Sequence, residues 1–322
     1  MPDLMRASSW LSALLTFAAS GVYGFSLVCL LAQILPEIRT LQLVVSFLPH
    51  VLVAGVVASL ALAFIRPYFA FAGAILVLVS GAPFLLLSKY EAPVAADCAP
   101  GECLTVITAN ILERREAMIA LSALAEREDA DLISINEAVS RMTDYSYRSA
   151  FPNHQYVVHA AWENMPRPMG NPITLLSRIP IADRQRTLRD DTAGRAYIVA
   201  DLGGDWQQTR LVLAHAMVPL WNEGLKARSA LLDAASTAAE ESETFMMMGD
   251  FNLTPWAPHF RDLPGKRAGD PRWTATWPTR LRMLGIPIDH IMYDGELQLV
   301  EVRVLESIGS DHLPVLARFR KP

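Results

Sequence analysis

The apolar residues of this chain gather at its N-terminal end. Three stretches, Trp10 to Leu35, Leu41 to Ile65 and Pro67 to Ser88, contain no Asp, Glu, Lys or Arg. Each reaches the roughly 20 residues that an α-helix needs to cross a hydrocarbon layer. They also lack the polar face of a helix that packs in water. The pattern predicts an anchor of three transmembrane helices within residues 1–88, at about 10–35, 41–65 and 67–88.

A cleaved signal peptide is the alternative for the first stretch, because Arg6 precedes an apolar run that reaches small residues at 18–20. It leaves the other two stretches unexplained. With three crossings, Arg6 and Arg66 both lie on the side where short positive loops remain, the cytoplasm. The bias is small, since Arg39 and Lys89 then lie outside. It predicts a protein of the inner (cell) membrane whose remaining chain is periplasmic.

Two cysteines, Cys98 and Cys103, lie in a turn-rich stretch directly after the apolar region. The short Pro-Gly loop between them can bring the two sulfurs together, and a stable disulfide implies an oxidising compartment. Two free thiols or half of a metal site are the alternatives, although no cysteine follows Cys103. We favour the disulfide, which agrees with a domain outside the cytoplasm.

The pattern of apolar positions changes after residue 88. Residues 89–103, rich in Ala, Pro and Gly, indicate a linker. Short β-branched or apolar segments follow, as is typical of strands, and residues 118–128 and 227–239 indicate helices. The strands are expected at 104–108, 131–135, 156–159, 173–176, 196–201, 211–215, 245–248, 290–293 and 315–320. Many short strands with few helices predict an α/β fold, a two-sheet α/β sandwich over residues 104–322.

The charge of this second region is negative. Only four of the 28 basic and two of the 33 acidic residues lie in positions 1–90, so acidic residues outnumber basic ones by seven in the rest. Proteins that grip long nucleic acid through its phosphates usually carry a basic excess. The charge therefore weighs against duplex DNA as a substrate, although a local basic groove is compatible with it.

Polar side chains stand at the ends of the predicted strands. They are Asn110, Glu137, His215, Asp250, Asn252, Asp289, Asp311 and His312. Strand ends meet at one rim of such a fold, where binding and catalytic groups collect. Hydrolysis of a phosphoester needs a hard cation held by carboxylates, a base that aligns water, and donors to the phosphoryl oxygens. Glu137 and Asp311 can hold the cation, Asp250 or His312 can be the base, and the two Asn and His215 can donate.

Five segments occur in a fixed order between residues 104 and 320: Thr108-Ala109-Asn110, Ile135-Asn136-Glu137, Gly249-Asp250-Phe251-Asn252, Ile288-Asp289-His290 and Ser310-Asp311-His312-Leu313-Pro314-Val315. Together they resemble the endonuclease/exonuclease/phosphatase superfamily, which includes deoxyribonuclease I. Each segment alone is a weak motif, since Asn and Asp are also common in turns and helix caps. All five in order are specific, and the resemblance implies a deoxyribonuclease I-like sandwich.

The resemblance also implies a metal site. By it, Glu137 binds Mg²⁺ or Mn²⁺, with Asn110 and Asp311 beside it, and Asn110 also faces the substrate. This chain departs from the superfamily at Asn136, where a Gln usually precedes the metal-binding Glu. The shorter amide puts a contact behind the metal carboxylate in doubt.

The remaining roles follow from the same resemblance. Asp250 orients or deprotonates the attacking water, and Asn252 and His215 bind the phosphate. His312 faces the phosphate and is aligned by Asp289. The resemblance does not decide whether Asp250 or His312 is the base.

The sequence therefore predicts a membrane-anchored, metal-dependent phosphoester hydrolase, a nuclease or phosphodiesterase that acts on nucleic acid or a phospholipid head group outside the cytoplasm. The expected partners are that substrate and the lipid bilayer, and no protein partner is evident. The alternative is a catalytically silent binding or scaffold module with the same fold. Because Glu137, Asp250, Asp289 and His312 are all present, the enzyme is favoured.

Overall fold

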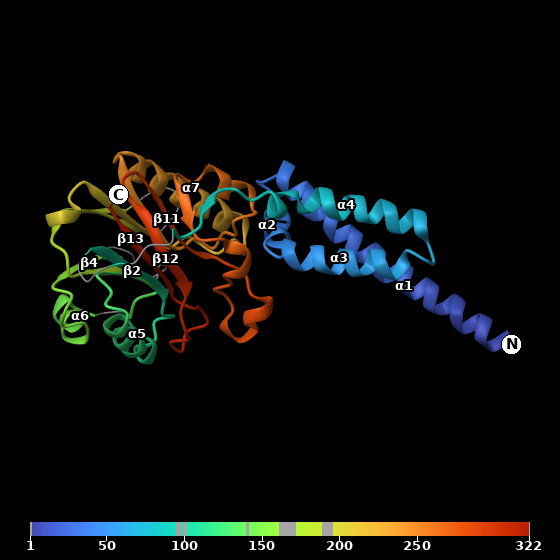
Figure 1. Cartoon of the computed structure of the whole chain (residues 1–322), viewed down its shortest axis with the longest axis horizontal. Coiled ribbons are helices and arrows are strands. Elements are labelled where there is room, and N and C mark those ends of the chain that lie inside the picture. The colour runs from blue at the N-terminus through green and yellow to red at the C-terminus, as the bar shows by residue number, and fades with distance from the viewer. Residues whose placement is uncertain are drawn as a thin grey trace. The chain divides into compact units, whose positions relative to one another are not determined.

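The structure is a computed structural model that describes residues 2–94, 98, 102–139, 142–160, 172–188 and 196–321. It divides into two compact units (Figure 1). The helical unit holds Met1–Ser88 together with the later segment Pro255–Arg261, and the second unit holds Lys89–Thr254 and Asp262–Pro322. The chain therefore enters the helical unit twice.

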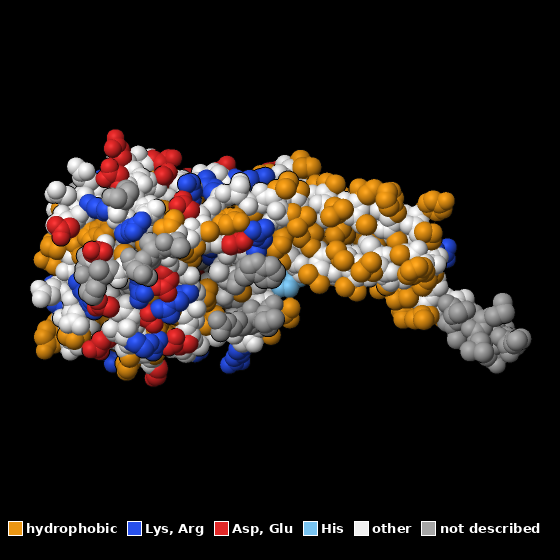
Figure 2. Space-filling model, viewed as in Figure 1, with side chains coloured by type: hydrophobic (Ala, Val, Ile, Leu, Met, Phe, Trp, Pro, Cys, Tyr) orange, Lys and Arg blue, Asp and Glu red, His pale blue; other side chains and the backbone are white. Residues whose placement is uncertain are grey.

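The helical unit contains four helices, α1 (Pro2–Ile34), α2 (Arg39–Val45), α3 (Leu48–Leu62) and α4 (Pro67–Leu85). Helices α1 and α4 run in the same direction, and α3 runs opposite to them and packs against both (Figure 1). Hydrophobic side chains cover most of the visible outside of these helices, as Figure 2 shows. Within the described residues, two helical stretches are long and apolar enough to cross a membrane, Ser9–Ile34 and Pro67–Leu85.

The second predicted transmembrane helix, at 41–65, is not one continuous helix. It is broken into α2 and α3, which meet at an angle of 67° and count as a third span only if the bent pair is taken as one. Pro49, in the first turn of α3, supplies the reason. In a continuous helix the N–H of residue 49 would donate to the Val45 carbonyl, and proline has no N–H. A count of apolar residues does not detect this break.

The second unit is built on two mixed sheets. The first has the order β1 (Tyr90–Glu91), β10 (Lys266–Ala268), β11 (Asp289–Asp294), β9 (Thr244–Asp250), β8 (Thr209–Ala214), β7 (Ala196–Leu202) and β6 (Ile181–Leu188). The second has the order β12 (Gln298–Val304), β13 (Val315–Arg320), β2 (Cys103–Asn110), β3 (Leu132–Asn136), β5 (Ile173–Ser177) and β4 (Tyr156–Ala160). The pairs β2–β3 and β8–β9 are parallel, so their ends reach the same edges.

The core lies in two layers. One apolar cluster packs between the two sheets, and another packs between the second sheet and helices α5 (Arg115–Arg127) and α6 (Asp144–Ala150). Helix α7 (Asn222–Glu240) packs on the outer face of the first sheet, over β8 and β9. The predicted two-sheet α/β sandwich is thereby confirmed (Figure 1).

Several elements lie outside the sequence prediction. The segment predicted as a linker, 89–103, contributes β1, which pairs with β10, and the start of β2. Strands β6, β10 and β12 and the short 3-10 helices at Gly204–Trp206, Pro258–Asp262, Pro271–Trp273 and Thr279–Leu284 were not predicted either. Cys98 and Cys103 form a disulfide, with their Cα atoms 5.7 Å apart.

Candidate active site

Side chains alternate between the two faces of a strand, and this alternation places the candidate residues. In β9, Met248 packs between the sheets, so Asp250, two residues further on, faces the same way. In β11, Ile291 packs between the sheets, and Asp289 therefore does the same from the first position of the strand. The register pairs Asp289 directly with Asp250. The two acids thus continue the core face of their strands.

Asn110 and His215 follow the same rule. Val106 in β2 and Leu213 in β8 pack between the sheets, which directs Asn110 and His215 to the space between them. Glu137 follows β3, which runs parallel to β2 and ends at the same edge. The candidate residues therefore meet at one rim, where the core between the sheets ends.

Asn110 links two carboxylates at this rim. Its Nδ2 donates to Glu137 Oε1 at 3.2 Å and to Asp250 Oδ2 at 3.1 Å. His215 Nε2 lies 3.6 Å from the same two oxygens. Glu137 has a φ of 49°, a backbone region that costs a residue other than glycine roughly 1 kcal/mol or more and that is common at functional sites.

Asp250 is buried, and the chain around it is fixed by hydrogen bonds. Its Oδ1 accepts from the Asn252 backbone N–H at 2.9 Å, and Asn252 Nδ2 donates to the Ala216 carbonyl at 3.0 Å. Burial raises the pKa of Asp250 to about 7, and the charge of Asp289 acts in the same direction, while His312 opposes them. A carboxyl group with such a pKa can accept a proton near neutral pH.

His312 and Asp289 form a hydrogen-bonded pair. His312 Nδ1 lies 2.8 Å from Asp289 Oδ2, and His312 Nε2 lies 3.8 Å from Asp250 Oδ2. Burial alone lowers the pKa of His312, but the charges of Asp289, Asp250 and Asp311 and the Asp289 hydrogen bond outweigh it and raise the pKa to about 10. The imidazole is therefore a cation at neutral pH.

Two hydrogen bonds, one to its side chain and one to its backbone, hold Asp311 in place. Its Oδ2 accepts from Trp277 Nε1 at 3.1 Å, and its backbone carbonyl accepts from the Thr279 N–H. The Trp277 hydrogen bond had no counterpart in the sequence analysis, because an indole reaches a carboxylate 34 residues away only in the folded chain. Asp311 lies close enough to His312 to raise its pKa.

The residues present fit a divalent cation. Asp250 and Asp289 each offer a carboxylate oxygen beside His312, all within 4.8 Å of one another, and Asp289 Oδ1 is buried with no hydrogen-bond partner among the described residues. Because a protonated imidazole has no free lone pair, only the two carboxylates of this group can bind the cation while His312 is charged. Hard cations prefer such carboxylate oxygens. This trio differs from the set predicted from the sequence, Glu137, Asn110 and Asp311. Asn110 presents Nδ2 to the carboxylates while its Oδ1 accepts from the Leu112 N–H, so its role as a metal ligand stays a prediction.

Two buried cations support the chain after Asp250, and sequence reasoning assigned neither a role. Arg228 of α7 donates to the Asn252 carbonyl at 2.8 Å, and burial lowers its pKa to about 10. It occupies a core position of the helix, between Leu225 and Leu231, and a charge at such a position was the available sequence signal. Arg267 donates through Nε to His290 Nδ1 at 2.9 Å, and His290 Nε2 lies 2.8 Å from the Leu253 carbonyl.

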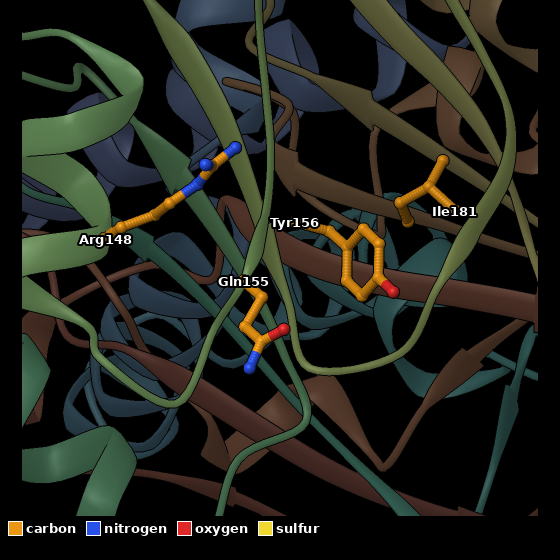
Figure 3. Close-up of a pocket in the computed structure, with 4 residues that line it drawn as sticks. All are labelled: Arg148, Gln155, Tyr156 and Ile181. Atoms are coloured by element: carbon orange, nitrogen blue, oxygen red, sulfur yellow. The ribbon is translucent and has the colours of Figure 1, made fainter.

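A hollow of about 650 Å³ lies elsewhere in the sandwich, lined by Arg148, Gln155, Tyr156 and Ile181 (Figure 3). Tyr156 pairs with Ser177, which pairs with Leu132 at the start of β3. Glu137 follows the other end of β3. The hollow therefore lies at the end of the sheet away from the candidate site.

The family model of the Endonuclease/Exonuclease/phosphatase family matches residues 107–312, which is more than half of the chain and includes every predicted catalytic, substrate-binding and metal-binding residue. The chain belongs to this family. The predicted resemblance is thus confirmed. Members of the family are generally phosphoester hydrolases, nucleases and phosphatases among them. No curated protein matches the chain.

Solved structures share the fold of this family member. A humanized D. rerio TDP2 matches with a TM-score of 0.54 at 13% identity, covering 69% of this chain and 100% of that one. The human Nocturnin catalytic domain with bound sulfate matches with a TM-score of 0.54 at 15% identity, covering 69% and 95%. A Staphylococcus aureus beta toxin mutant with bound magnesium ions matches with a TM-score of 0.53 at 14% identity, covering 68% and 99%.

Asn136, where this family member departs from the usual Gln, lies behind the site. Its Nδ2 lies 3.5 Å from Thr108 Oγ1, and its Oδ1 is buried without a hydrogen-bond partner among the described residues. A Cβ on Gly249 would meet this oxygen at 3.1 Å and the Ala214 carbonyl at 2.0 Å, and Gly249 has a φ of +140°. The glycine therefore lets β9 lie directly against the Ala214 carbonyl of β8 and the Asn136 amide of β3, one residue before Asp250.

Proposed function

We propose that this protein is a membrane-anchored, divalent-metal-dependent phosphoester hydrolase. The observation that carries the proposal is the geometry of Asp250. A buried carboxyl group with a pKa near neutrality faces a cationic His312 across 3.8 Å, at the rim that also holds Glu137 and His215. A proton acceptor beside fixed positive charge suits the attack of water on a phosphate.

The roles of the residues follow from their contacts. Asp250 accepts the proton of the attacking water, and Asn110 and the Asn252 backbone N–H hold its two oxygens in place. His312, fixed by Asp289, donates through Nε2 to a non-bridging oxygen of the phosphate as negative charge builds there. A cation bound by the carboxylates of this rim would neutralise the phosphoryl oxygens. The magnesium ions in the structurally similar beta toxin support Mg²⁺ over other cations, with Mn²⁺ as the alternative.

The placement outside the cytoplasm is part of the proposal. The disulfide of Cys98 and Cys103 suits an oxidising compartment. The parallel course of α1 and α4, with α3 running back, puts the N-terminal end of α1 and Arg66 at one end of the helical unit and the end of α4 at the other. This arrangement agrees with three crossings, positive charge inside, and the sandwich in the periplasm.

The charge of the second unit and two exposed side chains near the site bear on the substrate class. The acidic charge after residue 90 weighs against long nucleic acid. Leu220 and Trp221, 56% and 47% exposed, follow His215 in the loop between β8 and α7. Exposed Leu and Trp are typical of a surface that meets the membrane interface, which favours a phospholipid head group over nucleic acid.

The test is hydrolysis by the purified full-length chain with Mg²⁺, Mn²⁺ or EDTA. The panel comprises plasmid DNA, single-stranded DNA, RNA, phospholipid, sphingomyelin and bis-p-nitrophenyl phosphate. His312→Ala should remove metal-dependent cleavage. The matched control is His154→Ala, which removes an equally buried histidine whose Nε2 lies 3.0 Å from the Ala130 carbonyl and which lies outside the candidate site. If the folded wild-type chain cleaves nothing with either metal, the silent scaffold becomes the better explanation.

A further inference from the structure

Arg228 is a buried cation with few partners. It lies 2% exposed on the core face of α7, and its Nη1 donates to the Asn252 carbonyl at 2.8 Å. Its Nε has no hydrogen-bond partner among the described residues, and none of their acidic side chains favours its charged form. Burial lowers its pKa to about 10, so the guanidinium is still charged at neutral pH. An unpaired buried charge is costly, and buried polar groups are nearly always hydrogen-bonded.

The second buried arginine of the sandwich, Arg267, is satisfied where Arg228 is not. All three of its guanidinium nitrogens donate hydrogen bonds, to a histidine, to two backbone carbonyls and to a threonine. The charges of Asp270 and Asp289 also favour its charged form against the effect of burial. Arg267 therefore has the partners of a structural cation. Core packing gives no comparable reason for a charge at Arg228.

The one group that Arg228 contacts through Nη1 belongs to a residue of the candidate site. Asn252 has a φ of 47°, in the left-handed region that residues other than glycine rarely adopt, although Asn enters it more readily than most. Its N–H donates to Asp250 Oδ1 at 2.9 Å, and its Nδ2 donates to the Ala216 carbonyl at 3.0 Å. The φ and ψ of Asn252 set the angle between the peptide that carries this N–H and the peptide that carries the carbonyl.

Arg228 therefore restrains the angle on which the contact with Asp250 depends. It holds the carbonyl side of Asn252, while Asp250 holds the N–H side. Without the guanidinium, Asn252 can relax toward the common backbone region, and such a rotation turns its N–H and its side chain away from their present partners. Arg228, Asn252 and Asp250 all belong to the second unit, so the contact lies within one compact body.

We propose that Arg228 is a positioning residue that holds Asn252 in its left-handed conformation and so keeps Asp250 and the Asn252 amide aligned for attack on the phosphate. The inference rests on the proposed function. It assigns the burial of an unpaired charge to the needs of the site and not to the stability of the fold.

The experiment compares full-length variants in detergent, with bis-p-nitrophenyl phosphate and Mg²⁺ as the probe. Arg228→Met keeps an apolar chain of similar length and removes the charge and the donors, and Arg228→Lys keeps a donor. The matched control is Arg210→Met. Arg210 also donates to a carbonyl of α7, that of Ala238 at 3.2 Å, and it pairs with Asp201 and Glu241, but it lies at the opposite end of β8 from the candidate site.

We expect Arg228→Met to lower kcat about tenfold with KM nearly unchanged, within the roughly 100-fold that a 1 Å misplacement can cost. Its melting temperature should be unchanged or higher, because an apolar side chain in place of a buried charge is often neutral or stabilising. Arg228→Lys should recover kcat to within about threefold of wild type, since an ammonium also donates strongly to a carbonyl. Arg210→Met should show the reverse pattern, a lower melting temperature with kcat within about twofold of wild type.

Three results overturn the inference. One is a kcat of Arg228→Met within twofold of wild type. Another is a kcat that falls as far in Arg210→Met as in Arg228→Met. The third is an Arg228→Met chain that does not fold or melts well below wild type, because the charge would then serve the fold. A wild-type chain without turnover would contradict the proposed function itself, and it is distinguished from these results by the wild-type measurement alone.

Discussion

Asp289→Asn removes the charge that holds the pKa of His312 high. Asp289 contributes both its charge and the 2.8 Å hydrogen bond, while burial acts in the opposite direction. With the pKa at about 10, about 99% of His312 is charged at pH 8. If the pKa falls the whole way to its ordinary value of 6.5, about 3% is charged at pH 8 and roughly three quarters at pH 6. The charged form is thus lost up to about 30-fold at pH 8 and largely recovered at pH 6.

The assay is the ratio of kcat between Asp289→Asn and wild type, measured from pH 6 to pH 8 with saturating Mg²⁺. Using the ratio cancels the titration of groups whose surroundings the substitution leaves unchanged. Asp250 is the exception, because Asp289 raises its pKa and the His312 cation lowers it, so the two losses offset one another in part. Any loss of imidazole orientation lowers the ratio equally at every pH, whereas loss of charge lowers it most at pH 8. We expect the ratio to rise by an order of magnitude on acidification. A ratio that stays constant across this range would refute the argument that the charge of His312 acts in catalysis.

Three further outcomes follow from the site. Asp250→Ala should lower kcat by roughly 1,000-fold or more, since it removes the proposed base, while circular dichroism and the melting temperature show that the fold persists. Gly249→Ala should destabilise the chain by about 2 kcal/mol or more in urea unfolding, because its Cβ would lie 2.0 Å from the Ala214 carbonyl at a φ of +140°; a change below 0.5 kcal/mol would contradict the crowding between β8 and β9. Glu137→Gln should raise the Mg²⁺ concentration for half-maximal activity at least about tenfold, and an unchanged metal titration would remove Glu137 from the metal site.

Much of the sandwich could be predicted because strand patterns are local. The central strands β2, β3, β8 and β9 are nearly continuous apolar runs, which their burial on both faces requires. The strands that were not predicted, such as β12 and β1, lack a continuous apolar run. β12 is an edge strand with alternating charges, and β1 spans only two residues, which pair with β10. Their pairing depends on the rest of the sheet more than on their own composition.

In the helical region, hydropathy predicts the apolar segments but not the break between α2 and α3. Hydropathy identifies residues 10–35 and 67–88 because it counts apolar side chains over a length. It does not count backbone hydrogen bonds, so it misses the consequence of Pro49 and the break between α2 and α3. It also cannot indicate that residues 255–261, which lie in the catalytic half of the sequence, group with these helices.

The candidate site could be predicted as a set of residues, but the interactions that hold it could not. The order of the motifs located Glu137, Asp250, Asp289 and His312. The support from Arg228, the His290–Arg267 pair and the indole of Trp277 joins residues between 23 and 37 positions apart. Such contacts are properties of the folded chain, and only Arg228, a charge at a core position of a helix, left a trace in the sequence pattern.

Asp250, Asp289 and His215 lie on the core face of their strands because side chains alternate along a strand. This alternation limits which mutations the protein can tolerate. A slip of one residue in β8, β9 or β11 would turn the candidate catalytic side chain away and, in the same strand, replace buried apolar residues by their outward-facing neighbours. A chain with a candidate site residue misplaced in this way would therefore also fail to fold. Mutations that adjust the substrate are then confined to the loops beyond the strand ends, where length and sequence can vary without either penalty.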